Sequence, residues 1–464
     1  MTKVIKQTLR DSKKARWTAL VILSFTMFAG YMFTEVISPL KPIMERSLGM
    51  DSTDYGFITS AYGLFNVFLL MLIFVGVFLD KFGIRFSTIA SALIMIIGAS
   101  IKYAAFKGLI GSPEVPIHIP LVNINLTTQV FWAGFGFAVF GVGVEYAGIT
   151  VSKSVAKWFK GKEMALAMGM QVAIARLGSF APLAFGAKIA NTYDVPFTIL
   201  IVIVFLILGL IGFFYYNTLD RKLDKQLVEE ADYAGEDKFK LSDLLVIFGN
   251  LGFWLIALLC VFFYSTVFPF YKYGPDLMVN KFGVSENWAG LLPSLVPFGT
   301  MLLTPIFGSL YDKKGKGASI MILGAVLLII VHVVFYLPFI TSVVAAFFNV
   351  LLLGIAFSLV PSAMWPSVPK IIPERQLGSA YAVIFWVQNF GLWGIPLAVG
   401  IVLDKTNPGV AAAKAAGEAI IYDYQTTWTI FVGLTILALI TAILLKAEDK
   451  RKGYGLELPN IKKI

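Results

Sequence analysis

We predict that this chain is an all-α membrane protein with twelve transmembrane helices, arranged as two pseudo-symmetric bundles of six. Three observations predict that class. The 464 residues are 58% hydrophobic and 14% charged, with a mean hydropathy of +0.80, which is far more apolar than a soluble domain. Twelve apolar runs approach or exceed the roughly 20 residues that cross a bilayer. A polar segment near the middle separates the first six runs from the last six.

The apolar runs follow one another with short polar connections between them. The first run follows a basic N-terminal stretch and is too long for the core of a cleavable signal peptide. We expect helices at residues 17–43, 52–79, 84–106, 125–152, 163–190, 195–217, 243–271, 287–310, 317–338, 341–366, 374–403 and 421–446. The domain organisation is then an N-terminal bundle at 1–217, a cytoplasmic linker at 218–242 and a C-terminal bundle with a short tail at 243–464.

The distribution of Lys and Arg predicts the orientation. Most of the 38 basic residues fall at helix ends and loops on the side of the two termini, and few fall on the other side. Cytoplasmic loops of membrane proteins carry this excess of basic residues. Both termini are therefore expected in the cytoplasm. The net charge of +10 reflects this placement and is no sign of nucleic-acid binding.

A short motif occurs once in each half. GVFLDKFGIR at 76–85 closes the second helix, and GSLYDKKGK at 308–316 closes the eighth, 232 residues later (308 − 76). Internal duplication is how many transporters are built. The glycines of the motif allow tight turns, and its acidic and basic side chains can pair with a neighbouring helix end. We expect a conformational latch on the cytoplasmic side, formed by Gly76, Asp80, Gly83, Arg85, Gly308, Asp312 and Gly315.

Two opposite charges stand alone in the apolar fourth and fifth helices. Glu145 lies 16 residues before Gly161 (161 − 145) and Arg176 lies 15 after it (176 − 161), so both reach similar depth near the middle of the membrane. A charge there faces a cavity or a partner. In one interpretation Arg176 binds a substrate carboxylate and Glu145 a substrate ammonium. In the other, the two form an internal salt bridge.

The corresponding hairpin of the second half carries amides. Gln388 lies 15 residues beyond Pro373 (388 − 373), at the depth of Arg176 in the first half. Gln388 and Asn389 are candidates to hydrogen-bond a substrate, or else they join helices. Trp365 is a candidate stacking face, or else an interfacial anchor.

Two further polar residues are candidates for the substrate site. Tyr264 precedes a helix-bending proline in the seventh helix. Glu35 lies toward the outer end of the first helix, where it either contacts substrate or pairs with Lys41 at the surface.

The composition argues against other classes. One cysteine, Cys260, and two distant histidines give no basis for a disulfide, a metal site or a cofactor. A membrane enzyme would need a nucleophile and base, or metal ligands, facing one cavity. A sensor would need an added signalling domain. We expect neither, and we expect a monomer whose partners are lipid and a small solute.

Several segments resemble a known family. They are DKFGIR (80–85), WFKGKE (158–163), ARLGS (175–179), VFPF (267–270), MWPS (364–367), PE (373–374), QLG (376–378) and QN (388–389). With the duplicated motif, they resemble the major facilitator superfamily, and more narrowly its branch of lysosomal dipeptide carriers. That branch implies a Glu and an Arg acting on peptide termini, and favours Trp365 and Asn389 over Gln388 as pocket residues. The N-terminal tail lacks an acidic dileucine signal, so we expect a bacterial relative in the plasma (inner) membrane.

The expected function is alternating-access transport of a small zwitterion, most simply a dipeptide, as a uniporter or a proton symporter. The alternative is a carrier of small organic anions, in which Arg176 binds the substrate and Glu145 orients it.

Overall fold

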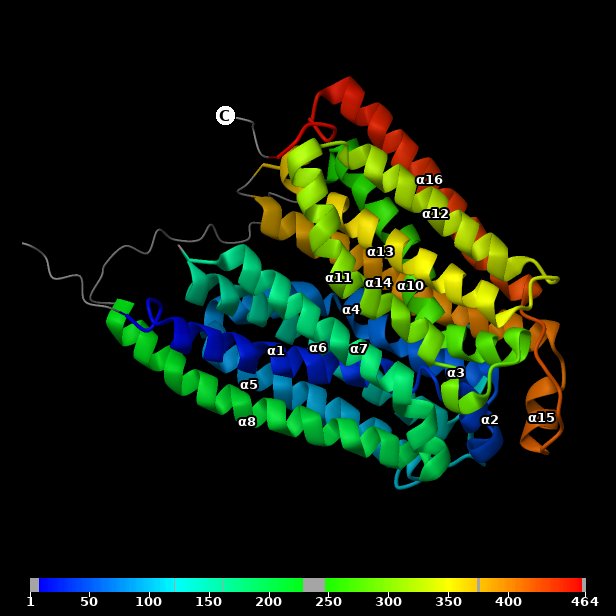
Figure 1. The fold of residues 1–464 in the computed structure, drawn as a ribbon. Coiled ribbons are helices and arrows are strands. Elements are labelled where there is room, and N and C mark those ends of the chain that lie inside the picture. The colour runs from blue at the N-terminus through cyan, green and yellow to red at the C-terminus, as the bar shows by residue number, and fades with distance from the viewer. Residues whose placement is uncertain (1–7, 121, 161, 228–246, 374–375, 461–464) are drawn as a thin grey trace, which may run out of the picture.

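The computed structural model describes residues 8–120, 122–160, 162–227, 247–373 and 376–460. Within them, eleven helices are long and apolar enough to cross a membrane, and a bent pair supplies a twelfth span. The fold class predicted from the sequence is therefore confirmed. Two lobes of helices lie side by side and diverge toward the end where the described N- and C-terminal residues lie (Figure 1). We call that end the terminal side and the opposite end the distal side.

The N-terminal half contains the first six spans. Its elements are α1 (Lys13–Glu35), α2 (Lys41–Leu48), α3 (Ser52–Ser60), a 3-10 turn η1 (Ala61–Gly63), α4 (Leu64–Phe68), α5 (Met71–Phe106), β1 (Pro116–Ile119), β2 (Ile124–Thr127), α6 (Thr128–Phe159), α7 (Met164–Thr192) and α8 (Val195–Leu227). The C-terminal half contains α10 (Leu251–Phe282), η3 (Glu286–Trp288), α11 (Leu291–Lys314), α12 (Gly317–Tyr336), α13 (Val343–Ile371), α14 (Leu377–Thr406), α15 (Val410–Ala415) and α16 (Gln425–Lys452).

The first span is shorter than predicted. It ends at Glu35 instead of residue 43, and α2 begins a separate helix at Lys41. Pro39 interrupts the helix because proline lacks a backbone N–H and disfavours helical geometry in the residue before it. Pro42 then stands in the first turn of α2, where proline is well tolerated. The break turns the chain along the distal surface.

The second span is bent. Leu70 adopts a left-handed backbone with φ 52°, and the pieces Ser52–Phe68 and Met71–Leu79 meet at 62°. Gly83, with φ 77° and ψ 173°, then separates the second span from the third inside α5. Only glycine adopts this conformation without strain, which explains its place in the motif.

Two other boundaries differ from the prediction. Residues 125–127, predicted to be helical, belong to β2, which pairs antiparallel with β1 in a distal hairpin, and α6 begins at Thr128 with Thr127 as its N-cap. Helix α8 continues to Leu227, so the first residues assigned to the linker are helical. Asp220 and Asp224 hold these added turns through ion pairs to Lys157 at 2.8 and 2.6 Å. Residues 228–246 lie outside the described part.

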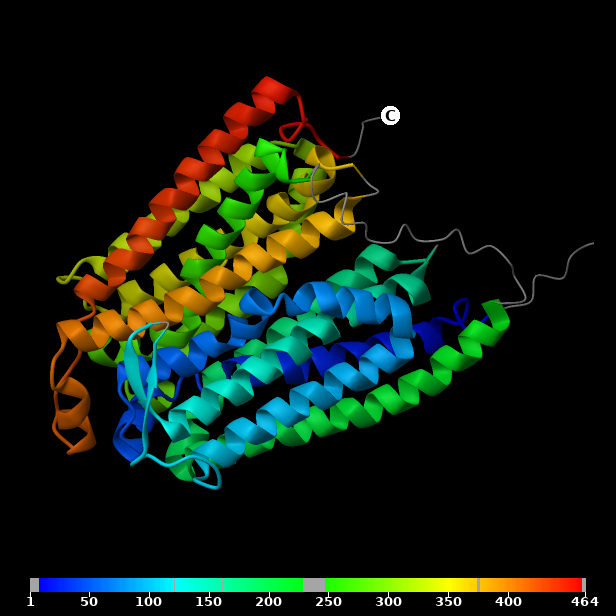
Figure 2. The same ribbon diagram turned by 180° about the vertical axis from the view of Figure 1, so that it is seen from behind.

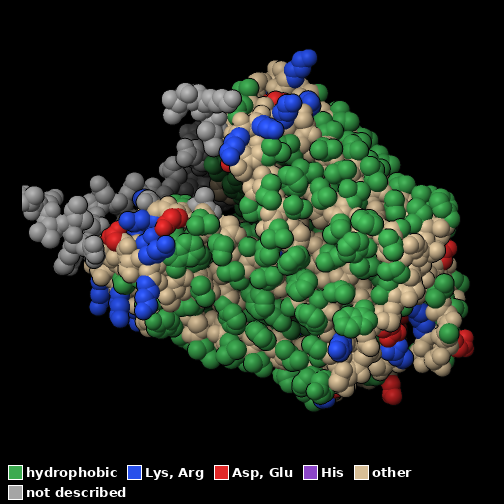
Figure 3. All heavy atoms as spheres, viewed as in Figure 1, with side chains coloured by type: hydrophobic (Ala, Val, Ile, Leu, Met, Phe, Trp, Pro, Cys, Tyr) green, Lys and Arg blue, Asp and Glu red, His purple; other side chains and the backbone are tan. Residues whose placement is uncertain are grey.

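Figure 2 shows the same two lobes from behind, in contact toward the distal side. Here α3 packs on α14, and α7 on α11. A space-filling view shows hydrophobic side chains over the flank of the helices and Lys and Arg gathered near their ends (Figure 3). That distribution fits a lipid-facing belt between two polar surfaces.

Candidate substrate-binding site

A cavity of about 1210 Å³ lies between the two halves. It exceeds the 300–1,000 Å³ typical of small-molecule pockets. Its walls reach Gly76 and Lys153 near the terminal ends of their helices, so it extends toward the terminal side. Residues that line it include, from the N-terminal half, Tyr31, Thr34, Glu35, Tyr62, Glu145, Gln171 and Arg176, and from the C-terminal half, Tyr264, Phe268, Lys272, Phe357, Trp365, Tyr381, Phe385 and Gln388.

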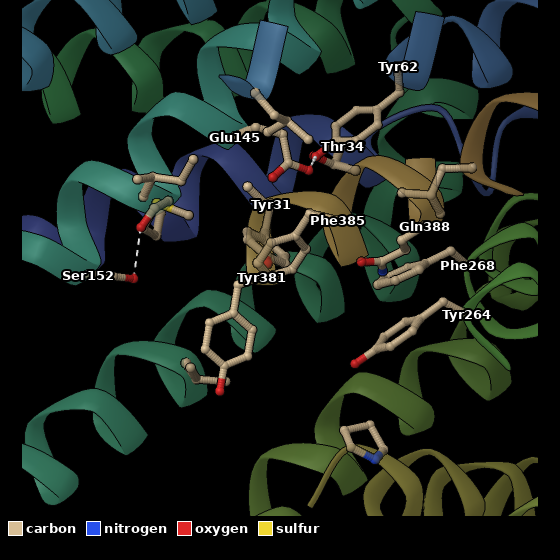
Figure 4. A pocket seen from close by; sticks show the side chains of 18 of the residues that line it. Tyr31, Thr34, Tyr62, Glu145, Ser152, Tyr264, Phe268, Tyr381, Phe385 and Gln388 are labelled. Carbon is tan, nitrogen blue, oxygen red and sulfur yellow. Dashed lines mark hydrogen bonds between the residues drawn. The ribbon is translucent and has the colours of Figure 1, made fainter. Parts of the chain in front are cut away.

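Glu145 projects into this cavity from α6. Its Oε1 accepts a hydrogen bond of 2.8 Å from the hydroxyl of Tyr62, which stands on η1 (Figure 4). Among the described residues, no Lys, Arg or His lies within 4.0 Å of its carboxylate. A carboxylate in this setting is expensive to desolvate, and a ligand ammonium would supply the missing counter-charge.

Arg176 projects into the same cavity from α7. Its guanidinium carbon lies 5.0 Å from the centroid of the Phe357 ring and 6.0 Å from that of Tyr31. One terminal nitrogen, Nη1, is buried and has no hydrogen-bond partner among the described residues. Ring faces attract the cation but accept few of its five N–H donors. The guanidinium therefore retains donor capacity for a carboxylate.

The salt bridge that was the alternative for these two residues is absent from the described structure. Glu145 bonds to Tyr62, and Arg176 is stacked between an aromatic ring of each half. The two charges thus line one cavity without neutralising each other. This is the arrangement that the substrate interpretation requires.

The C-terminal half supplies an aromatic wall. Trp365 donates from Nε1 to the Tyr264 hydroxyl at 3.1 Å, and its ring lies 5.1 Å from that of Phe385. Trp365 therefore lines the cavity and is no interfacial anchor. Tyr264 stacks on Phe268 with ring centroids 5.4 Å apart, and Figure 4 shows both beside Gln388.

Of the two amides, the structure places only Gln388 in the cavity lining. Asn389 is 1% exposed; its Nδ2 donates to the Phe385 carbonyl at 2.9 Å and its Oδ1 accepts from Asn66 at 3.4 Å. The expectation that favoured Asn389 over Gln388 as a pocket residue is therefore wrong in this conformation. In this rotation of α14, Gln388 faces the cavity and Asn389 faces Asn66 of the other half.

Glu35 lies at the distal end of the cavity and is buried. Its Oε2 pairs with Lys272 of α10 at 2.7 Å and accepts from Ser38 at 2.6 Å. The predicted alternative, a surface pair with Lys41, is wrong. Lys41 is itself buried between Glu45 and Asp276. Both lysines therefore join the N-terminal half to the C-terminal half.

Sequence reasoning missed Lys272 because it ended the seventh helix at residue 271, whereas α10 continues to Phe282. It also missed Tyr62 and Phe357, since one aromatic residue in an apolar helix carries no distinctive signal. One clue to the pair was available in the sequence. Glu35 of the first helix and Lys272 of the seventh are opposite charges at matched places in the two halves.

The distal side is sealed by further contacts between the halves. Arg46 pairs with Glu286 at 2.8 Å. Asp404 of α14 accepts from the backbone N–H groups of Ser52 and Thr53, at 3.1 and 2.6 Å, and so caps α3. Burial, with the nearby charge of Asp404, raises the pKa of Asp51, the N-cap of α3.

The motif residues contact their own half in this conformation. Arg85 pairs with Asp224 at 2.8 Å, and Asp312 accepts from Asn460 of the C-terminal tail at 2.8 Å. Gly315 has φ 70° and packs against the tail. A Cβ atom added at Gly76 or Gly308 would meet no atom within 4 Å. The side chain of Asp80 lies outside the described part. A latch between the halves remains a prediction for the conformation in which the terminal side is closed.

Within the described residues, no group of His, Cys, Asp and Glu side chains is arranged to hold a metal ion.

Two lobes of membrane helices around a central cavity closed at one end define a membrane transporter. The family model of the Major Facilitator Superfamily matches residues 23–396, and the chain belongs to that family. Its members are transporters and not enzymes, so the chain works in lipid on a small-molecule solute.

Among curated relatives, the human lysosomal dipeptide transporter MFSD1 is 27% identical over 453 residues, covering 95% of this chain and 88% of the relative. The Gallus gallus protein of that name is 32% identical over 313 residues, covering 65% and 69%. Among solved structures, the nucleoside transporter NupG has a TM-score of 0.66 at 15% identity, covering 93% of this chain and 98% of that one. An inward-facing, unoccupied bacterial homologue of the human lysosomal transporter Spinster has a TM-score of 0.67 at 13% identity, covering 97% and 99%. These structures share the fold.

Proposed function

We propose that this protein transports small zwitterions, dipeptides first among them, by alternating access. The observation that carries the proposal is the separation of Glu145 and Arg176. A carboxylate and a guanidinium line one cavity, and each lacks an ionic partner among the described residues. A dipeptide carries an ammonium at one end and a carboxylate at the other, so it would give both Glu145 and Arg176 an ionic partner. The similarity to MFSD1 supports the same solute class.

In this mechanism the substrate is bound mainly by the N-terminal half. Arg176 donates to the terminal carboxylate, and Glu145, oriented by Tyr62, accepts from the terminal ammonium. Trp365, Tyr264 and Gln388 form the opposite wall, with ring faces for side chains and an amide for the peptide bond. The halves then rock about the site, and the distal ion pairs form and break.

We assign the terminal side to the cytoplasm and the protein to a bacterial plasma membrane. The basic residues at the terminal ends of the helices support this orientation. The structure then corresponds to the conformation that exchanges substrate with the cytoplasm.

Uptake by purified protein in liposomes tests the proposal. Labelled dipeptide should enter with the parent protein but not with Arg176→Ala or Glu145→Ala, because either change leaves one substrate charge buried and unpaired. Arg221→Ala, which removes an exposed arginine, is the matched control and should keep its uptake. Normal uptake by folded Arg176→Ala protein would refute the proposal.

A carrier of small organic anions is the second candidate. One observation favours it: Glu145 already has a hydrogen bond from Tyr62, whereas Nη1 of Arg176 has none. Competition of uptake by mono- and dicarboxylates, without competition by dipeptides, would establish this candidate instead.

A further inference from the structure

One buried lysine in the described structure is set apart from the others. The lysines buried there are Lys41, Lys102 and Lys272. Lys41 lies 2.9 Å from Asp276, and Lys272 lies 2.7 Å from Glu35. The Nζ of Lys102 is buried without a hydrogen-bond partner, and no carboxylate among the described residues lies within 4.0 Å of it.

The immediate surroundings of Lys102 are aromatic. It stands on α5, and its Nζ lies 3.7 Å from the ring centroid of Phe137 and 5.4 Å from that of Phe33. Ring faces replace only part of the hydration that a buried amine loses. An apolar side chain of similar size would fill this space without that cost. Packing in this conformation therefore does not account for a lysine.

Phe33, whose ring centroid lies 5.4 Å from the Nζ of Lys102, stands two residues before Glu35 on α1, and Lys272 pairs with the Glu35 carboxylate. Glu35 belongs to α1, in the same half as Lys102. The Phe33 ring, on α1, contacts Phe140 of α6 with centroids 4.4 Å apart, and Lys102 lies over the Phe33 ring. Glu35 and Lys102 consequently stay together when the halves rock, whereas Lys272 moves with α10.

Opening of the distal side withdraws Lys272 from Glu35. The Glu35 carboxylate then needs a new cation, and Lys102 is a buried amine without a partner on the same half. We propose that Glu35 exchanges Lys272 for Lys102 when the distal side opens. Lys102 is thus a positioning residue that acts through Glu35. The exchange keeps the carboxylate paired in both conformations, so neither is strongly favoured. The proposed exchange of lysines does not depend on which solute is transported.

Distances between spin labels test the exchange without a substrate. Labels are placed on cysteines introduced at Ser47 of α2 and Lys405 of α14, which are exposed on the distal side of opposite halves, in a Cys260→Ala background. Lys272→Met cuts the pair between the halves and should populate the long distance of the open distal side. In the protein with Lys272 intact, Lys102→Met should reduce the open population by about tenfold or more, because the Glu35 carboxylate then has a cation only in the closed conformation. Lys102→Arg in place of Lys102→Met should restore it.

Two matched measurements separate this role from packing. Lys107→Met removes an exposed lysine at the end of the same helix and should not change the distances. In the protein with Lys272 intact, Lys102→Met should raise the melting temperature, because an unsatisfied buried amine is replaced by an apolar group, while it lowers the open population. If Lys102→Met does not fold, Lys102→Gln is measured against the same controls.

The exchange is refuted if Lys272→Met fails to open the distal side. It is equally refuted if Lys102→Met leaves the open population unchanged in the protein with Lys272 intact, or if Lys102→Arg does not restore that population.

Discussion

Closure of the distal side depends on close backbone contact between α3 and α14, and Gly400 provides it. A Cβ atom added at Gly400 would lie 2.2 Å from the carbonyl oxygen of Ser52 in the other half and 3.0 Å from its carbonyl carbon. Both atoms belong to the backbone, so no side-chain rotation can relieve the clash. The added Cβ would also lie 3.0 Å from the Tyr273 hydroxyl of the same half, but that oxygen is the end of a side chain and can shift slightly. We predict that Gly400→Ala disfavours the distal-closed conformation while each half folds normally, because the backbone clash exists only where the halves meet.

The expected free-energy cost of Gly400→Ala follows from the 2.2 Å between the added Cβ and the Ser52 carbonyl oxygen. Ordinary contacts begin near 3.4 Å, so the helices must separate by about 1 Å, and such overpacking costs about 1–3 kcal/mol. At 1.36 kcal/mol per tenfold, the ratio of closed to open molecules should fall by about 5- to 150-fold. Spin labels at Ser47 and Lys405 report this ratio directly.

Gly394→Ala is the control on the same helix, since a Cβ added there meets nothing within 4 Å. It should leave the distance distribution unchanged. An unaltered distribution for Gly400→Ala, or an equal shift for Gly394→Ala, would refute the closure described above.

Two further predictions concern the site and the distal contacts. Phe357→Leu should weaken binding of substrates with a free carboxylate by about 2- to 30-fold, the range of one cation–π contact, because the ring beside the Arg176 guanidinium is lost. In a thermal-shift titration, Phe357→Trp should restore the binding. Unchanged binding in Phe357→Leu would contradict the role of the ring in positioning Arg176. Lower pH should favour distal closure, because burial and the charge of Asp404 raise the pKa of Asp51 in the closed form. The closed form therefore binds a proton at Asp51 more tightly than the open form does. The effect should appear between the ordinary carboxyl pKa of about 3.9 and the raised value. Asp51→Asn keeps a good N-cap and should reduce the pH dependence of the label distances; distal opening on acidification would contradict the assignment.

Long apolar runs made the twelve spans predictable, since each needs only length and hydropathy. Their ends were less predictable. Pro39 stops α1 early, whereas α10 continues past residue 271 to Phe282 because buried contacts on the distal side satisfy its polar residues. Lys272 makes three such contacts, to the Thr34 carbonyl, Glu35 and Ser38. Partners of this kind come from the other half and cannot be inferred from local sequence.

The site was predictable where a charge stood alone in an apolar helix. Glu145 and Arg176 could be placed at one depth from their distance to a shared turn. Which of Gln388 and Asn389 faces the cavity depends on the rotation of α14, and helical spacing alone leaves that rotation undetermined. Whether Glu145 and Arg176 pair with each other depends on Tyr62 and Phe357, whose contacts exist only in the assembled bundle.

A thermal-shift titration with three ligands tests the central claim most directly. The ligands are a dipeptide, its N-acetyl form without the ammonium, and its C-terminal amide without the carboxylate. The parent protein should bind the dipeptide at least about 30-fold more tightly than either derivative, from about 2 kcal/mol per unpaired buried charge. Arg176→Gln should lose the discrimination against the amide alone, and Glu145→Gln that against the N-acetyl form alone. Full discrimination in both variants would contradict the assignment of these charges to the substrate's two ends.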